Sequence, residues 1–148
     1  MRNYKILLLV ATFFLFACSK AGDSPAPVTP PVVVVPEVDL AFKVEIPVST
    51  EIDYTKIYGA IGATQAINVN ITSALPTDGV TIDVKVTKDA ADNAVIFTNN
   101  FTSKTAASNT ITINSLSPGV LSTVTVVVTS KNKSTNTATK TFKIASKS

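Results

Sequence analysis

Apolar and polar residues alternate along most of this chain after Val38. Seven runs show the alternation, and turn-forming residues separate them. Alternation over roughly four to eight residues is the pattern of a β-strand with one buried face. The apolar positions expected on the buried faces are, run by run, Val38, Leu40, Phe42, Val44, Ile46 and Val48; Ile67, Val69 and Ile71; Val80, Ile82, Val84 and Val86; Val95, Phe97 and Phe101; Ile111, Ile113 and Leu116; Val124, Val126 and Val128; Phe142 and Ile144.

No stretch of similar length repeats its apolar residues at the helical period of about 3.6, and β-branched residues dominate the runs. Strands with one apolar face each must bury those faces against one another, in a two-sheet sandwich or a small barrel. The alternation also indicates antiparallel sheets with one solvated side. We therefore predict an all-β fold, a seven-stranded antiparallel β-sandwich, over residues 37–148.

Residues 52–64 do not alternate and fit two different structures. They could form a short helical turn or a connection that crosses from one sheet to the other. Glycines tolerate backbone conformations that other residues avoid, so Gly59 and Gly62 predict bends. The larger side chains of this segment are Tyr54, Ile57, Tyr58 and Ile61.

The N-terminus has the pattern of an export signal. Arg2 and Lys5 precede Ile6–Ala17, a run of twelve residues in which only Thr12 is polar. A membrane-spanning helix needs roughly 20 apolar residues, whereas a shorter run after positive charges is typical of a secretory signal. The run ends at Cys18, the only cysteine in the chain.

The sequence Leu15-Phe16-Ala17-Cys18 resembles the lipobox of bacterial lipoproteins. The resemblance implies removal of residues 1–17, a diacylglycerol on the Cys18 sulfur and an acyl chain such as palmitate on its new amino group. Two or three acyl chains anchor a protein far more firmly than one. An ordinary secretory peptide and an uncleaved short anchor are the alternatives. Ser19, Lys20 and Asp23 resemble the start of Bacteroidota lipoproteins, which implies the outer membrane and a position that can face outward.

Residues 18–36 combine the expected lipid attachment with a proline-rich linker. Proline fixes φ and removes a hydrogen-bond donor, so the stretch favours an extended chain. At about 3.1 Å per residue, it would span about 50 Å between membrane and domain. A proline-rich ligand for a partner is the alternative, and the apolar run Val32–Val35 could join the first edge strand. The prolines are Pro25, Pro27, Pro30, Pro31 and Pro36.

One motif resembles the E strand, the E–F corner and the F strand of fibronectin type III and related immunoglobulin-like domains. Leu116, Pro118 and Gly119 match the Leu-x-Pro-Gly of the corner, and alternating valines follow. The resemblance implies an immunoglobulin-like or fibronectin type III-like sandwich. Ser122 stands where the corner has its tyrosine, and the chain has no tryptophan, so the resemblance is one of superfamily.

Composition argues against catalysis and against cofactors other than the lipid. The chain of 148 residues has no histidine, so it lacks the commonest general base and metal ligand. With one cysteine it forms no internal disulfide. Asp89–Asn93 is the densest group of oxygen ligands and would suit a weak calcium site, but a solvated hairpin loop is the interpretation that we favour. We predict that the protein is not an enzyme and holds no metal.

Charge is divided unevenly along the chain. Residues 18–100 carry five lysines and ten acidic residues, and residues 101–148 carry six lysines and no acidic residue. Lys131 and Lys133 could contact anionic glycans or lipid headgroups. We favour a second explanation, in which lysines along the last strand discourage edge-to-edge pairing. Nucleic-acid binding is not expected, because no arginine follows Cys18 and no aromatic residues interleave with the lysines.

Aromatic side chains suggest a second function. Most lie on core positions, which leaves Tyr54 and Tyr58 as platforms on which a sugar could stack. The function that we predict is nevertheless a non-enzymatic envelope lipoprotein. Its sandwich would serve adhesion or act as an accessory module of a surface assembly, with another envelope protein or a glycan as partner. The alternative is a glycan-binding component of a surface polysaccharide uptake system.

Overall fold

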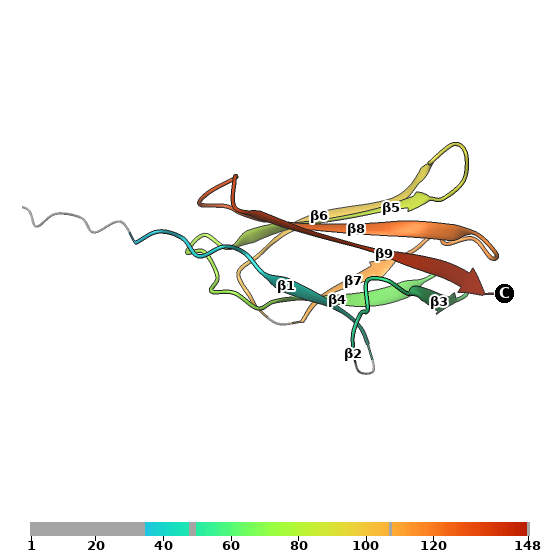
Figure 1. The fold of residues 1–148 in the computed structure, drawn as a ribbon, viewed down its shortest axis with the longest axis horizontal. Helices are drawn as coiled ribbons and strands as arrows, with labels where there is room; N and C mark the ends of the chain where they lie inside the picture. The colour runs from blue at the N-terminus through green and yellow to red at the C-terminus, as the bar shows by residue number, and fades with distance from the viewer. Residues whose placement is uncertain (1–34, 48–49, 107, 148) are drawn as a thin grey trace, which may run out of the picture. The chain divides into compact units, whose positions relative to one another are not determined.

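A computed structural model of the chain describes residues 35–47, 50–106 and 108–147. Every regular element within them is a strand (Figure 1). Cys18 and the predicted signal and linker lie outside the described residues, apart from Val35 and Pro36. The strands are β1 Phe42–Ile46, β2 Thr50–Glu51, β3 Ile57–Ile61, β4 Gln65–Ile71, β5 Val80–Lys88, β6 Val95–Ser103, β7 Asn109–Ile113, β8 Leu121–Ser130 and β9 Thr137–Lys147.

The strands form two sheets that pack face to face as a sandwich (Figure 1). One sheet has the order β2-β1-β4-β7, and the other has the order β3-β9-β8-β5-β6. Neighbouring strands are antiparallel except β3 and β9, which run parallel with Tyr58 opposite Ile144. The described part contains no helix with the length and apolar character needed to cross a membrane.

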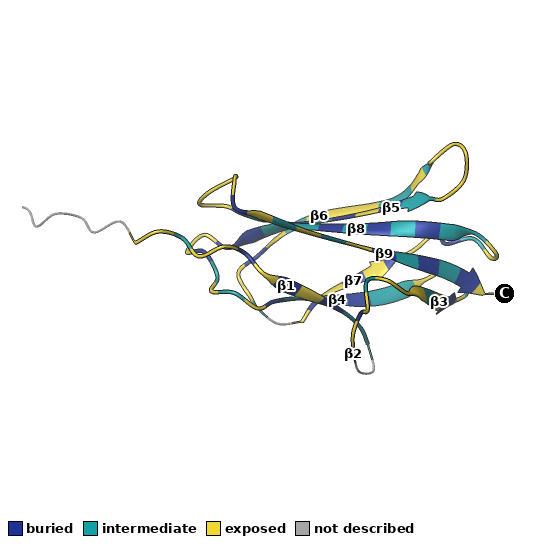
Figure 2. Ribbon diagram, viewed as in Figure 1, coloured by how far each residue is buried: buried dark blue, intermediate teal, exposed yellow. Residues whose placement is uncertain are grey.

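The core lies between the sheets and follows the alternation of the sequence. Along β8, buried residues alternate with half-buried ones, and Val124, Val126 and Val128 are fully buried (Figure 2). Val44 and Val69 come from the first sheet and are equally buried. Burying a side chain of this size contributes about 1.5–3 kcal/mol. Because the apolar faces of both sheets meet, the predicted sandwich is confirmed.

The seven predicted runs correspond to β1 and β4–β9, but the described residues contain nine strands. The two additional strands are too short or too irregular to show alternation, since β2 has two residues and β3 contains Gly59. The prediction that all pairs are antiparallel is wrong for β3. This strand reaches β9 through a connection between the sheets and therefore need not reverse direction as a hairpin does.

Two predicted core positions lie on the surface. Val38 is 59% exposed because β1 begins four residues later, at Phe42. Val95 is 51% exposed, beside a bulge between Val86 and Thr87 that shifts the β5–β6 register. Val48 lies outside the described residues.

Residues 52–56 connect the two sheets, so the first part of the segment that did not alternate is a crossing connection, and residues 57–61 form β3. Ile52 is buried, and its N–H donates to the carbonyl of Val44 at 2.9 Å. Gly62 has a φ of +73° in the turn after β3, as a predicted bend requires. The bend predicted at Gly59 is wrong, because this glycine lies within β3 opposite Ala145.

Candidate functional site

The structure does not bring the four predicted binding residues together. Tyr58 lies in β3, which pairs with the C-terminal part of β9. Lys131 and Lys133 lie in the hairpin that precedes the other end of β9. The two tyrosines and the two lysines therefore belong to separate surfaces, and each is described on its own.

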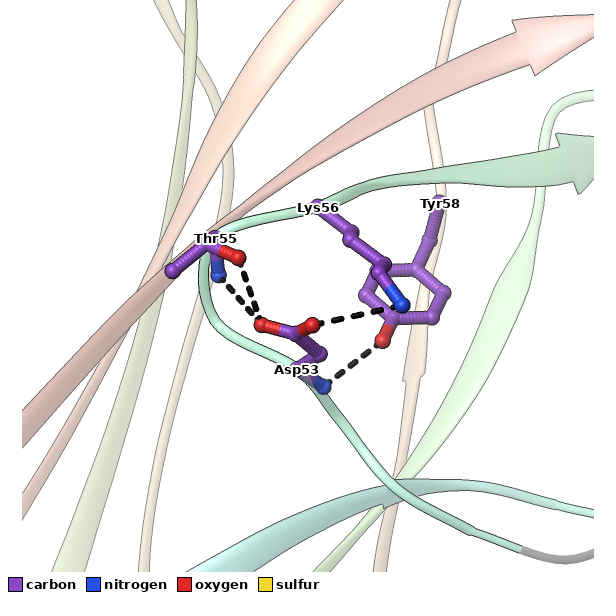
Figure 3. A network of polar contacts seen from close by, with 4 residues as sticks. All are labelled: Asp53, Thr55, Lys56 and Tyr58. Atoms are coloured by element: carbon purple, nitrogen blue, oxygen red, sulfur yellow. Dashed lines mark hydrogen bonds and ion pairs between the residues drawn. The ribbon is translucent and has the colours of Figure 1, made fainter.

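Tyr58 holds the crossing connection against the core. Its hydroxyl accepts a hydrogen bond from the backbone N–H of Asp53 at 2.7 Å (Figure 3). Its ring meets the buried Phe142 ring edge to face, with 6.4 Å between the centroids and 85° between the planes. Such pairs add about 0.5–1.5 kcal/mol to the burial of the rings. Both the ring and the hydroxyl of Tyr58 therefore make contacts that stabilise the fold.

Asp53 closes the turn between Ile52 and β3. One carboxylate oxygen accepts hydrogen bonds from Thr55, at 3.0 Å from its N–H and 2.7 Å from its hydroxyl. The other oxygen lies 3.3 Å from the Lys56 ammonium (Figure 3). The hydrogen bonds from Thr55, and to a lesser degree Lys56, hold the pKa of Asp53 below its ordinary value. This network orders the connection that positions both tyrosines.

Tyr54 bridges the two sheets. Its hydroxyl accepts the N–H of the buried Val44 at 3.1 Å and so satisfies a backbone donor on the edge of β1. The Lys140 ammonium lies over the Tyr54 ring, 4.2 Å from its centroid, and 5.8 Å from the centroid of Phe42. A sugar stacking on that face of Tyr54 would have to displace Lys140. The sequence shows Lys140 only as one of the charges on the last strand, and no spacing along the chain indicates its contact with Tyr54.

The hairpin between β8 and β9 presents Lys131 and Lys133 to solvent. The hydroxyl of Ser130 accepts the N–H groups of Asn132 and Lys133, each at 3.1 Å, and orders the turn. Asn132 donates to the Asp78 carboxylate at 2.6 Å and accepts its N–H at 3.0 Å. An acidic side chain thus lies beside the two lysines, which weakens their attraction for anions. In the described part of the chain, neither lysine forms an ion pair.

Asn136, at the end of the same hairpin, binds the segment that leads into β1. Its side-chain oxygen accepts the N–H of Leu40 at 2.9 Å, and its amide donates to the Val38 carbonyl at 2.9 Å and to Glu37 at 2.6 Å. A hollow of about 370 Å³ lies nearby, with Glu37, Leu75 and Asn132 among its lining residues. No pattern in the sequence indicates these long-range bonds of Asn136.

The outer face of the five-stranded sheet carries many hydroxyl groups. The strand registers place Thr137, Thr129, Thr81 and Thr102 in one row across β9, β8, β5 and β6. A second hollow, of about 320 Å³, lies on this face across β5, β6 and β8. Its polar lining includes Asp83, Lys85, Thr98, Asn100 and Thr125. The alternation identified these positions only as solvated, so their grouping came from the structure alone.

Asp89 is engaged by residues on two other strands. Its carboxylate forms an ion pair with Lys143 and accepts a hydrogen bond from the Thr123 hydroxyl. These contacts, with Lys143 first, lower the pKa of Asp89. No group of three or more acidic, cysteine or histidine side chains in the described residues is placed to hold a metal ion.

Comparisons with protein-family models, curated proteins and solved structures found no match.

Proposed function

We propose that this protein is a lipid-anchored, non-enzymatic component of a bacterial cell envelope, with its β-sandwich as an interaction module. The observation that carries the proposal is the position of Cys18, the only cysteine, directly after the apolar run Ile6–Ala17. Acylation at that position would attach the chain to a membrane through a proline-rich linker. The sandwich after the linker would then contact another envelope protein.

We further propose that the sandwich is of the immunoglobulin-like or fibronectin type III-like kind. The orders β1-β4-β7 and β9-β8-β5-β6 are those expected of such a domain, with β3 as an added strand beside β9. The predicted corner supports this: Leu116 is buried, and Gly119 has a φ of +72° between β7 and β8. Ser122, at the tyrosine position of the corner, is buried, and its hydroxyl has no hydrogen-bond partner in the described residues.

Metabolic labelling tests the anchor. Cells expressing the full chain are grown with an alkyne analogue of palmitate, and labelled protein is followed through membrane fractionation. We expect label and membrane association in the unchanged chain and neither in Cys18→Ser. Ser19→Ala is the matched control, because it alters the neighbouring residue and leaves the thiol, and it should keep the label. Labelling of Cys18→Ser at the level of the unchanged chain would refute the anchor.

Crosslinking in cells tests the interaction module. A photoreactive residue in the exposed Lys133 position and another in the exposed Thr139 position report on two surfaces of the sandwich. We expect at least one to yield a defined adduct with a second envelope protein, identified by mass spectrometry. Adducts with lipid alone at both positions would contradict a protein-binding role.

A glycan-binding component of an uptake system is the second candidate. It is favoured by the hollow on the outer face of the five-stranded sheet, whose lining residues include Thr98, Asn100 and Thr125. Titration with soluble oligosaccharides by calorimetry should then give saturable binding. Loss of binding in Asn100→Ala would assign the hollow, and loss in Tyr54→Ala would assign the tyrosine surface. Thr112→Ala on β7 is the control, and absence of saturation in the unchanged chain would refute this function.

A further inference from the structure

The outer edge of β6 has no partner strand within the described residues, since β6 pairs with β5 alone. It has nine residues and is the longest of the four edge strands, which are β2, β7, β3 and β6. An exposed strand edge offers unpaired backbone N–H and C=O groups to another strand. Proteins usually guard such edges with charges, proline or short length.

The other edges of the five-stranded sheet show these guards, and β6 does not. Beyond the part of β9 that β3 covers, Lys140 lies at the edge of the strand, over the Tyr54 ring. β3, at the far edge of this sheet, is guarded by its short length of five residues. In contrast, no charged residue and no proline occurs from Asn93 to Ser103. We therefore expect the edge of β6 to pair with a specific strand.

The sequence of β6 is complementary to itself about Asn99. An antiparallel pairing centred on this residue places Phe97 of one copy opposite Phe101 of the other, and Thr98 opposite Asn100. The same two pairs recur on the other side of the two-fold axis. Isologous pairing of this kind is the commonest way in which identical chains associate. We propose that β6 pairs with β6 of a second copy of this chain, which joins the two five-stranded sheets edge to edge.

The positions of Phe97 and Phe101 on β6 are compatible with this pairing. The register with β5 places Phe97 opposite Val86 and Phe101 opposite Ile82, both of which are buried, so the two phenylalanines share the inner face. Both rings are only half-buried in the single chain. Cross-strand aromatic pairs stabilise neighbouring strands, and they bury apolar surface as well. Pairing through β6 would cover the exposed parts of these rings.

Charge does not oppose the pairing. On the outer face, β5 places Lys85 beside Thr98 and Asp83 beside Asn100. Across the axis, Lys85 of one copy then shares a row with Asp83 of the other. Three strand spacings, about 14 Å, separate them. Solvent ions screen charges at that distance, so the row adds little attraction, but it juxtaposes no like charges.

Disulfide trapping of the full chain in membranes tests the register. Cysteine at position 99 lies next to its own counterpart across the axis, within the 4.4–6.8 Å between Cα atoms that a disulfide requires. Asn99→Cys should therefore form a disulfide-linked dimer under mild oxidation. Thr102→Cys is the matched control, because it lies on the same edge but about 20 Å from its counterpart. The unchanged chain is a second control, which shows how much dimer forms through Cys18.

Equal trapping at both positions, or none at position 99, would overturn the proposal. So would a disulfide between position 99 and a different protein, since the edge would then receive a foreign strand. Sedimentation of the purified full chain in detergent provides a second measurement, and we expect half-association at micromolar concentration. Asn99→Lys places two ammonium groups opposite each other and should weaken association at least tenfold. Thr112→Lys on β7 adds the same charge elsewhere and should leave it unchanged.

Discussion

The side-chain oxygen of Asn136 accepts a hydrogen bond from the backbone N–H of Leu40 at 2.9 Å, across 96 positions of the sequence. The same side chain donates to Val38 and Glu37. Asn136 is 7% exposed, so water would not readily replace these partners. One amide therefore fixes the start of the sandwich to its last hairpin.

Asn136→Ala should lower the free energy of unfolding by about 2–3 kcal/mol, because the change leaves a buried backbone N–H and a carbonyl without partners. Urea denaturation of the full chain in detergent measures the loss. Asn132→Ala is the control, since this residue is exposed and its two bonds to Asp78 can be replaced by water. Ordinary surface substitutions scatter by about 0.5 kcal/mol. If the two variants lose unfolding free energies that differ by no more than this, the amide does not fix the segment.

Tyr54→Phe should cost about 1–2 kcal/mol, because it removes the acceptor of the buried Val44 N–H and keeps the ring. Tyr58→Phe removes an equivalent bond, but its donor belongs to the exposed Asp53 and can turn to water. We therefore expect a smaller loss for Tyr58→Phe, with both measured by thermal and urea unfolding. The reverse order would contradict the role given to the Tyr54 hydroxyl.

The ion pair of Asp89 with Lys143 predicts a dependence of stability on pH. The folded-state pKa of Asp89 is lowered, so the pair stabilises the fold above the ordinary carboxyl pKa and this contribution disappears as pH falls through the lowered value. At pH 6 the unchanged chain should exceed Asp89→Asn in stability, by no more than about 1 kcal/mol for so exposed a pair.

At pH 2 the difference should be smaller than at pH 6, because a larger fraction of Asp89 is then protonated. Unfolding free energies measured at both values check this, and Lys143→Gln should reproduce the behaviour of Asp89→Asn. Asp92→Asn serves as the control. Asp92 lies in the same loop as Asp89, and its carboxylate forms no ion pair with a described residue. A difference that persists unchanged at pH 2 would mean that Asp89 acts through its shape and hydrogen bonds rather than its charge.

Ser122→Ala should leave the stability unchanged or raise it, by up to about 1 kcal/mol. The Ser122 hydroxyl is buried without a hydrogen-bond partner in the described residues, so its removal relieves a desolvation cost. Ser130→Ala on the same strand should instead destabilise, because Ser130 accepts two backbone N–H groups. Calorimetric unfolding temperatures compare the two variants. Equal losses in both would indicate that Ser122 has a partner, such as a bound water.

The alternation of apolar residues predicted most of the fold, because a strand with one buried face repeats its chemistry at every second position. It failed where that periodicity is absent. The two-residue β2 is too short to show a pattern, and Gly59 interrupts β3. At β6 the pattern was correct for Phe97 and Phe101, but the bulge between Val86 and Thr87 places Val95 opposite Thr87 and leaves it exposed. A bulge cannot be recognised from local periodicity alone.

The candidate sites were less predictable than the fold. Tyr54 and Tyr58 were identified by elimination as aromatic residues outside the core pattern, and the structure gives both hydroxyls backbone partners. The contacts of Lys140, Asp89 and Asn136 join residues far apart in sequence. No spacing along the chain encodes such contacts, because they depend on how the two sheets and their hairpins pack.

The mass of the N-terminal peptide of the native protein, extracted from its membranes, tests the lipid anchor most directly. We expect a chain that begins at Cys18, with a diacylglycerol on its sulfur and an acyl group on its amino nitrogen. A chain that begins at another residue, or a peptide in which Cys18 retains a free thiol, would contradict it.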